Sequence, residues 1–165
     1  MKTVLVPTDF DLESLTIIDA LALTNPSETL NIVLMHAFKI SDSISDLLML
    51  GRRSKDYEHV SDEFYTQMNL YMQKYKGKIE RISIQYFYGN TVAAFRNFIE
   101  NLEVSYIAYP IDYQFNAISK YSIDPRTLIS RSKCDVLALA TNDITAHENL
   151  YETKMPEEQL QGIVA

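Results

Sequence analysis

The polar side chains best placed to do chemistry follow short apolar runs of the sequence. Thr8 and Asp9 come directly after the run Thr3–Val6, and His36 lies near the end of the run Leu30–Ala37. Both runs are rich in β-branched and aliphatic residues, which is typical of buried strands. Ligands of open α/β sheets bind beyond the carboxyl ends of such strands. These positions therefore indicate a binding site, with Asp9 as its first candidate.

No pattern of residues in the sequence indicates catalysis or metal binding. A hydrolase needs a nucleophile, a base and an orienting group, but His36, His59 and His147 stand in unrelated contexts. We interpret His36 as a satisfied core residue and Cys134 as a small packed hydrophobe. No group of His, Cys and Asp residues has metal-ligand spacing. The sequence therefore predicts neither an enzyme nor a metal site.

Thr8 and Asp9 also have a purely structural interpretation. Both stand just before an expected helix, Leu12–Leu23. A side-chain oxygen at that position can cap the free N–H groups of the helix, and a carboxylate there interacts well with the helix dipole. Capping and ligand binding both remain open for these two residues.

An aromatic stretch follows the fourth expected strand and leaves two alternatives. Its rings either fill the cleft beside Asp9 or line an apolar pocket for a flat small molecule. The rings are those of Tyr109, Tyr113, Phe115 and Tyr121. The pocket candidates that we carry forward are Tyr109, Asp112 and Ser122.

Strands alternate with helices along the chain, which predicts a parallel sheet covered on both faces. The expected strands are Thr3–Val6, Leu30–Ala37, Lys78–Tyr88, Val104–Tyr109 and Asp135–Ala140. Between them, helical periodicity runs over Leu12–Leu23, Val60–Tyr75, Val92–Leu102 and Arg126–Ser132. Strands one and four should flank the point where strand order reverses, which is where such sheets bind ligands.

Composition narrows the classes of partner. The 165 residues carry a net charge of −7, which disfavours a nucleic-acid backbone, and no run is long and apolar enough for a membrane span. Cys134 is the one cysteine, so we expect no internal disulfide and a cytoplasmic location. Residues 1–140 should form one domain. Residues 141–165, with five acidic residues against one lysine, should form a partly disordered or partner-bound tail.

Several motifs, in this order, resemble those of the universal stress proteins. The opening Lys2–Phe10 (KTVLVPTDF) is similar to their first strand and turn, and Leu34–Ala37 to the end of their second strand. Gly89–Asn90, Val104–Ala108 and Leu128–Ala140 (LISRSKCDVLALA) resemble the later units. The resemblance covers roughly residues 1–140. It implies a three-layer, Rossmann-like sheet of the adenine-nucleotide α-hydrolase type, with strand order 3-2-1-4-5.

The resemblance also assigns a vestigial nucleotide site. In nucleotide-binding members, the residue that matches Asp9 bonds the adenine amino group, Thr8 lies beside it, and the backbone at Ala37 faces the adenine. Those members carry Gly-x-x-Gly and then Gly-Ser or Gly-Thr after strand four, because glycine lets the backbone approach a polyphosphate. This chain has no glycine between Tyr109 and Ser132.

The residues that replace the glycines oppose phosphate binding. Pro110 removes a backbone donor, Asp112 adds a negative charge, and Ser122 stands where the Gly-Ser pair would begin. Lys120 and Arg126 are the cations that could compensate. We therefore expect no cofactor and disfavour ATP.

Together these features predict a non-enzymatic universal stress-type protein that acts as a homodimer in stress response or regulation. By resemblance, the dimer should pair through the last strand, at Val136, Leu137, Ala138 and Leu139. The alternative is a sensor that binds an adenine nucleotide or another small molecule in the cleft at Asp9.

Overall fold

A parallel five-stranded sheet forms the centre of the molecule. The computed structural model describes residues 1–24, 26–40 and 59–141. The strands are β1 (Lys2–Pro7), β2 (Leu30–Phe38), β3 (Ile79–Tyr88), β4 (Tyr106–Pro110) and β5 (Val136–Leu139). They lie in the order β3-β2-β1-β4-β5, and all neighbouring pairs are parallel. The predicted sheet and its strand order are confirmed.

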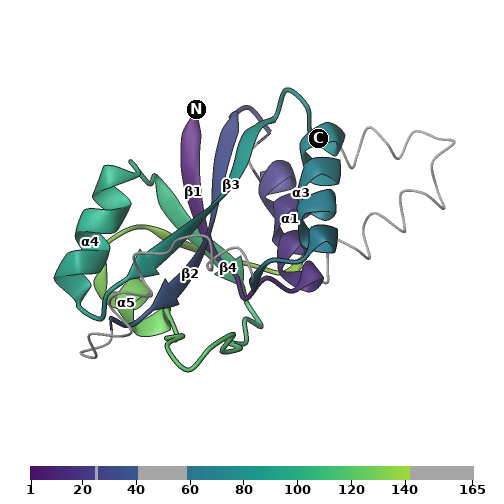
Figure 1. The fold of residues 1–165 in the computed structure, drawn as a ribbon. Coiled ribbons are helices and arrows are strands. Elements are labelled where there is room, and N and C mark those ends of the chain that lie inside the picture. Colours follow the sequence, from purple (N-terminus) through teal and green to yellow (C-terminus); the bar gives the residue numbers. More distant parts are fainter. Residues whose placement is uncertain (25, 41–58, 142–165) are drawn as a thin grey trace, which may run out of the picture.

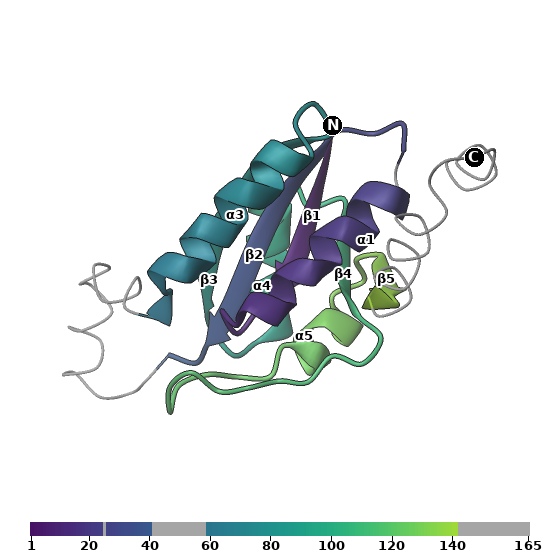
Figure 2. The ribbon, with the colours of Figure 1, turned by 90° about the vertical axis from the view of Figure 1, so that its right-hand side faces the viewer.

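Helices cover both faces of this sheet, as Figures 1 and 2 show. The short 3-10 helix η1 (Leu12–Thr16), α1 (Ile17–Thr24) and α3 (Asp62–Lys74) cover one face. The helices α4 (Val92–Asn101) and α5 (Arg126–Arg131) cover the other. Each helical layer packs on its own buried apolar cluster, so the molecule has the expected three layers.

The apolar character of each strand accounts for its place in the sheet. In β2, every residue from Ile32 to Phe38 is buried, as expected for a strand covered on both faces. Because β1 lies between β2 and β4, the carboxyl ends of these three strands meet at one edge of the sheet. Strand order reverses there, since β2 and β4 extend from β1 in opposite directions.

Local signals in the sequence explain most element boundaries. The Thr91 side chain caps α4 by accepting a hydrogen bond of 3.1 Å from the Ala94 amide. Gly77 follows α3 with a φ of 86°, a conformation that favours glycine. The expected helix Leu12–Leu23 is instead divided, because η1 precedes α1.

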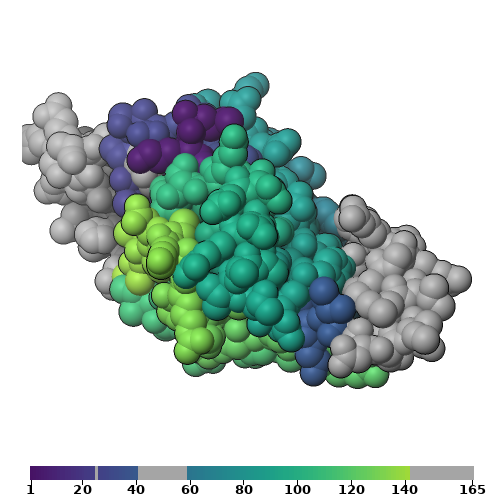
Figure 3. Space-filling model, turned by 90° about the vertical axis from the view of Figure 1, so that its left-hand side faces the viewer, coloured from purple at the N-terminus to yellow at the C-terminus, as the bar shows by residue number. Residues whose placement is uncertain are grey.

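The edge strand β5 and the outer face of the α4 layer lie on one side of the molecule. Figure 3 looks onto the layer of α4, with the region of α5 and β5 beside it. The strand β5 ends the sheet, and its Val136 side chain is 41% exposed, whereas Leu137 and Leu139 pack against the core. In the described part of the chain, every helix is too short or too polar to cross a membrane. The predictions for the acidic tail, from residue 142 onward, lie outside the described residues.

Candidate functional site

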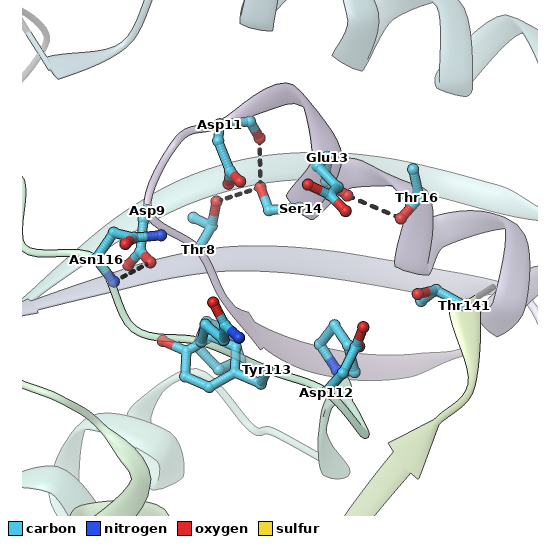
Figure 4. A pocket seen from close by; sticks show the side chains of 13 residues that line it. Thr8, Asp9, Asp11, Glu13, Ser14, Thr16, Asp112, Tyr113, Asn116 and Thr141 are labelled. Carbon is cyan, nitrogen blue, oxygen red and sulfur yellow. Dashed lines mark hydrogen bonds between the residues drawn. The ribbon is translucent and has the colours of Figure 1, made fainter.

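The predicted site region divides into two halves at the carboxyl edge of the sheet. One half lies over β1 and β2, and residues 111–123 run from the wall of the other half, at Asp112 and Tyr113, across it. We call these residues the strap. The other half lies between the ends of β1 and β4, and it contains a cavity of about 250 Å³. Figure 4 shows the residues that line this cavity.

The cavity is acidic. Its carboxylates belong to Asp9, Asp11, Glu13 and Asp112, and its other polar groups include the hydroxyls of Thr8, Ser14, Thr16 and Thr141. Among the described residues that line the cavity, none is basic. Such a lining produces a negative potential, which repels a phosphate group and attracts a cation.

The strap bonds the two groups that the resemblance assigns to adenine. The Asn116 amide donates to Asp9 Oδ2 at 2.6 Å, and the Ile123 amide donates to the carbonyl oxygen of Ala37 at 3.0 Å. A further bond of 2.8 Å joins the Lys39 amide to the Tyr121 carbonyl oxygen. The strap therefore bonds to the end of β2 and to Asp9.

The His36 side chain links β2 to the strap through a hydrogen bond with Ser122. Its side chain is 2% exposed, and Nδ1 lies 2.7 Å from the carbonyl oxygen of Thr8. Because a carbonyl oxygen can only accept, Nδ1 carries the hydrogen of the neutral ring. The other nitrogen, Nε2, lies 2.8 Å from Ser122 Oγ and accepts the hydroxyl hydrogen. His36 is thus a satisfied core residue, as predicted.

Ser122 is the centre of the strap's internal bonding. Its Oγ accepts hydrogen bonds from the Ile118 and Ser119 amides at 3.1 and 3.2 Å. These two bonds and the bond to His36 use both lone pairs and the hydrogen of the hydroxyl group. Ser122 stands where the Gly-Ser pair of nucleotide-binding members would begin. In this chain its hydroxyl group stabilises the conformation of the strap.

Asp9 is buried, and it does not cap a helix. Its side chain is 6% exposed, and Oδ1 lies 3.4 Å from His36 Nδ1 without a hydrogen-bond partner among the described residues. The residue that precedes η1 is Asp11, whose side chain also makes no capping bond. The capping interpretation of Asp9 is wrong, because Oδ2 is directed to the Asn116 amide across the cleft.

Thr8 has a local role. Its Oγ1 accepts a hydrogen bond of 3.0 Å from the Phe10 amide and lies 2.7 Å from Ser14 Oγ. Phe10 has a φ of 64°, so this bond supports a tight turn between β1 and η1. Asp9 stands in this turn, and its side chain reaches the strap at Asn116.

Asp9, His36 and Ser122 resemble a catalytic triad in outline but not in chemistry. The hydroxyl oxygen of Ser122 already accepts two amide hydrogens, so it has no free lone pair with which to attack a substrate. His36 Nδ1 makes its hydrogen bond to the Thr8 carbonyl oxygen rather than to Asp9. Neither His36 nor Ser122 lines the cavity. The arrangement is a structural link.

The aromatic residues of this region are divided between the two halves. The Phe115 ring stacks on His36, with ring centroids 6.3 Å apart, and so belongs to the filled half. Tyr113 lines the cavity, and the Tyr109 ring lies 6.1 Å from it. Burial, and then the charge of Asp9, raise the pKa of the Tyr113 phenol well above its usual value. Its Oη has no hydrogen-bond partner among the described residues.

Of the two cations that could have compensated for missing glycines, Arg126 lies over the ring of Tyr113, 5.7 Å from its centroid. The Arg126 guanidinium binds the Asp124 carboxylate at 2.5 Å and lowers the pKa of that carboxyl. The Lys120 ammonium lies over the Tyr121 ring, 5.0 Å from its centroid. Neither side chain lines the cavity. Within the described ranges, no group of three or more His, Cys, Asp and Glu residues could hold a metal ion.

The structure thus distributes the candidate residues over three places. Thr8, Asp9 and Asp112 line the cavity, whereas Ala37 and Ser122 bond to the strap or form part of it. Val136, Leu137, Ala138 and Leu139 form the edge strand β5. The sequence analysis missed Asn116, Ile118 and Ser119, since they act through backbone amides that every residue type except proline possesses.

Comparisons with known proteins agree with this fold. No family model and no curated protein matches the sequence. Among solved structures, the universal stress protein UspA from Lactobacillus plantarum is 12% identical, with a TM-score of 0.53. That match covers 84% of this chain and 97% of that one. The hypothetical protein MJ0577 is 14% identical with a TM-score of 0.51, and it covers 84% and 95% of the two chains.

A further hypothetical protein, PH0823, is 17% identical with a TM-score of 0.50, over 84% of this chain and 95% of that chain. At these identities the likeness concerns the fold. This chain therefore has the fold of the universal stress proteins.

Proposed function

We propose that this chain is a non-enzymatic universal stress-type protein, which acts as a homodimer in stress response or regulation and does not bind ATP. The observation that carries the proposal is the strap. The Asn116 and Ile123 amides take the positions on Asp9 and Ala37 that an adenine ring would need. An incoming nucleotide would have to displace both bonds and the stacked Phe115 ring.

The acidic cavity supports the same proposal from the phosphate side. Binders of polyphosphate present backbone N–H groups, a helix N-terminus or cations. Here Pro110 and Asp112 stand in the cavity wall with Asp9, Asp11 and Glu13. A triphosphate in this place would meet carboxylates without a basic side chain to balance its charge. A cytoplasmic location remains a prediction from the single cysteine.

The proposed dimer uses the edge strand β5. An unpaired edge strand offers free backbone groups to a second copy of the chain, and a two-fold contact satisfies both copies. Val136 is 41% exposed there, whereas Leu137 packs partly inward. A charge at Val136 should therefore weaken pairing and leave the core intact.

The test of the dimer is the molar mass in solution by light scattering. We expect a dimer for the natural protein and a folded monomer for Val136→Lys. The matched control is Leu70→Lys on α3, where the natural side chain is 49% exposed, and it should remain dimeric. A monomeric natural protein, or a Val136→Lys variant that stays dimeric, would reject pairing through β5.

A second candidate function is a small-molecule sensor that uses the cleft at Asp9, for an adenine nucleotide or another ligand. The open cavity favours it, because Asp9 and other polar groups line a space of about 250 Å³. Its test is ligand-dependent thermal stabilisation that is lost in Asp9→Ala and kept in Asp135→Ala, a change at an exposed aspartate outside the cavity.

A further inference from the structure

The link between His36 and the strap depends on the charge state of the imidazole. In the neutral ring, Nδ1–H donates to the Thr8 carbonyl oxygen, and Nε2 accepts from Ser122 Oγ. Ser122 Oγ accepts in turn from the Ile118 and Ser119 amides. Neutral His36 is therefore the state that completes all the hydrogen bonds around Ser122.

A second proton on the ring would disrupt this arrangement. It would bind to Nε2 and point at Ser122 Oγ, whose two lone pairs already accept amide hydrogens. The hydroxyl hydrogen of Ser122 would also lose its acceptor. A buried donor or acceptor without a partner is costly, so protonation favours separation of the strap from β2.

Asp9 is the carboxylate that can act as the counter-ion of a charged His36 ring in this buried position. A buried imidazolium needs a nearby counter-ion. Asp9 Oδ1 lies 3.4 Å from His36 Nδ1, is buried, and has no hydrogen-bond partner among the described residues. A charged His36 would attract this carboxylate, and that would weaken the hydrogen bond that the Asn116 amide donates to Asp9 Oδ2.

The rest of the surroundings is apolar or neutral. The rings that pack on His36 are those of Phe10, Phe38 and Phe115. The titratable groups around this shell are Tyr113 near Asp9, and His59, Tyr86 and Tyr88, which contact Phe38 or Phe10. In the described part of the chain, Asp9 is the charged group that faces the imidazole.

We propose that the strap is a proton-controlled latch, in which neutral His36 holds residues 116–123 closed over Asp9 and Ala37, and proton uptake by His36 releases them. Acid opens the latch and neutral or alkaline pH closes it, because the closed form requires an unprotonated Nε2. Histidine is the side chain type whose ordinary change of charge falls between about pH 5 and pH 8. The biological meaning of the latch rests on the proposed stress-type role. Acidification would then be the signal to which the protein responds.

The test is amide hydrogen exchange of the full chain at about pH 8 and about pH 5. Protection factors are ratios to intrinsic exchange rates, so they allow the two conditions to be compared. We expect the protection of the Asn116, Ile118, Ser119 and Ile123 amides to fall about tenfold or more at the lower pH. The amides between β1 and β2 serve as the internal reference and should keep their protection. Equal strap protection at both pH values would overturn the latch.

Two variants and one control locate the effect. Ser122→Ala and His36→Gln should give low strap protection at both pH values, because each lacks one side of the link. His59→Gln changes a histidine that is not bonded to the strap and should keep the natural response. If His36→Gln does not fold, Ser122→Ala decides alone, and a natural pH response in that variant would overturn the proposal. The dimer mass and ATP stabilisation are measured separately, so failure of the latch leaves the proposed function to its own tests.

Discussion

The two halves of the carboxyl edge differ in what satisfies their polar groups. Over β1 and β2, Asp9 Oδ2, the Ala37 carbonyl oxygen and both ring nitrogens of His36 have partners in the chain itself, supplied by the strap or by the β1 turn. Between β1 and β4, the carboxylates of Asp11 and Asp112 face an open cavity whose described lining contains no basic residue. One half is filled, and the other is open and acidic.

Under the proposed function, two separate features oppose nucleotide binding, one in each half. The filled half opposes the base, because amide donors already occupy its hydrogen-bonding groups. The open half opposes the phosphates through charge. Restoring glycines alone would therefore not recreate a nucleotide site, since neither the strap bonds nor the carboxylates depend on the missing glycines.

The largest expected effect comes from emptying the filled half. His36→Ala removes a buried ring that contacts Phe10, Phe38 and Phe115, and it leaves the Thr8 carbonyl oxygen and the Ser122 hydroxyl without their partner. We expect a loss of about 3 kcal/mol in the free energy of unfolding, measured by urea denaturation. The half-buried His59 is the control, and His59→Ala should cost about 1 kcal/mol or less. Equal losses would mean that the His36 link contributes little.

A paired change compares the two halves directly. Asp9→Ala removes the acceptor of the Asn116 amide, so it should lower the free energy of unfolding by about 1–2 kcal/mol. Asp112→Ala removes an exposed carboxylate of the open half, and the change should stay within about 0.5 kcal/mol. The same urea experiment measures both, and an Asp112 effect as large as that of Asp9 would contradict the division into halves.

The smallest expected effect is a gain in stability at the boundary between the halves. The Tyr113 hydroxyl is buried without a hydrogen-bond partner among the described residues, so Tyr113→Phe removes an unsatisfied group and keeps the ring. The free energy of unfolding should rise by about 1 kcal/mol. Tyr109→Phe, at the neighbouring ring, is the control and should change little. A loss of stability in Tyr113→Phe would show that the hydroxyl has a partner in solution.

The fold could be predicted from the sequence because its signals are local and repeated. Apolar runs such as Leu30–Ala37 define buried strands, and helical periodicity defines what covers them. The divided first helix was not predicted, since apolar spacing does not distinguish a 3-10 turn from an α-helical one over a few residues. Strand order followed from the resemblance, and the sheet confirms it.

The positions of the candidate residues at the strand ends were predictable, but their hydrogen bonds were not. Asp9 and Ala37 lie at the strand ends where they were expected, but their partners are backbone amides far along the chain. Backbone groups carry no signature in the sequence, and the path of the strap depends on tertiary contacts at Ser122 and Phe115. For the same reason, the bond from the strap to Asp9 was not among the alternatives of capping and ligand binding that the sequence offered.

The central claim is that the chain itself occupies the nucleotide site. Its most direct test is a melting scan of the purified protein with and without millimolar ATP–Mg²⁺, together with extraction of any bound nucleotide by denaturation. The account predicts an unchanged Tm and no adenine nucleotide in the extract. A Tm that rises with ATP concentration in the natural protein, but not in Asp9→Ala, would contradict it, because ATP would then displace the strap from Asp9.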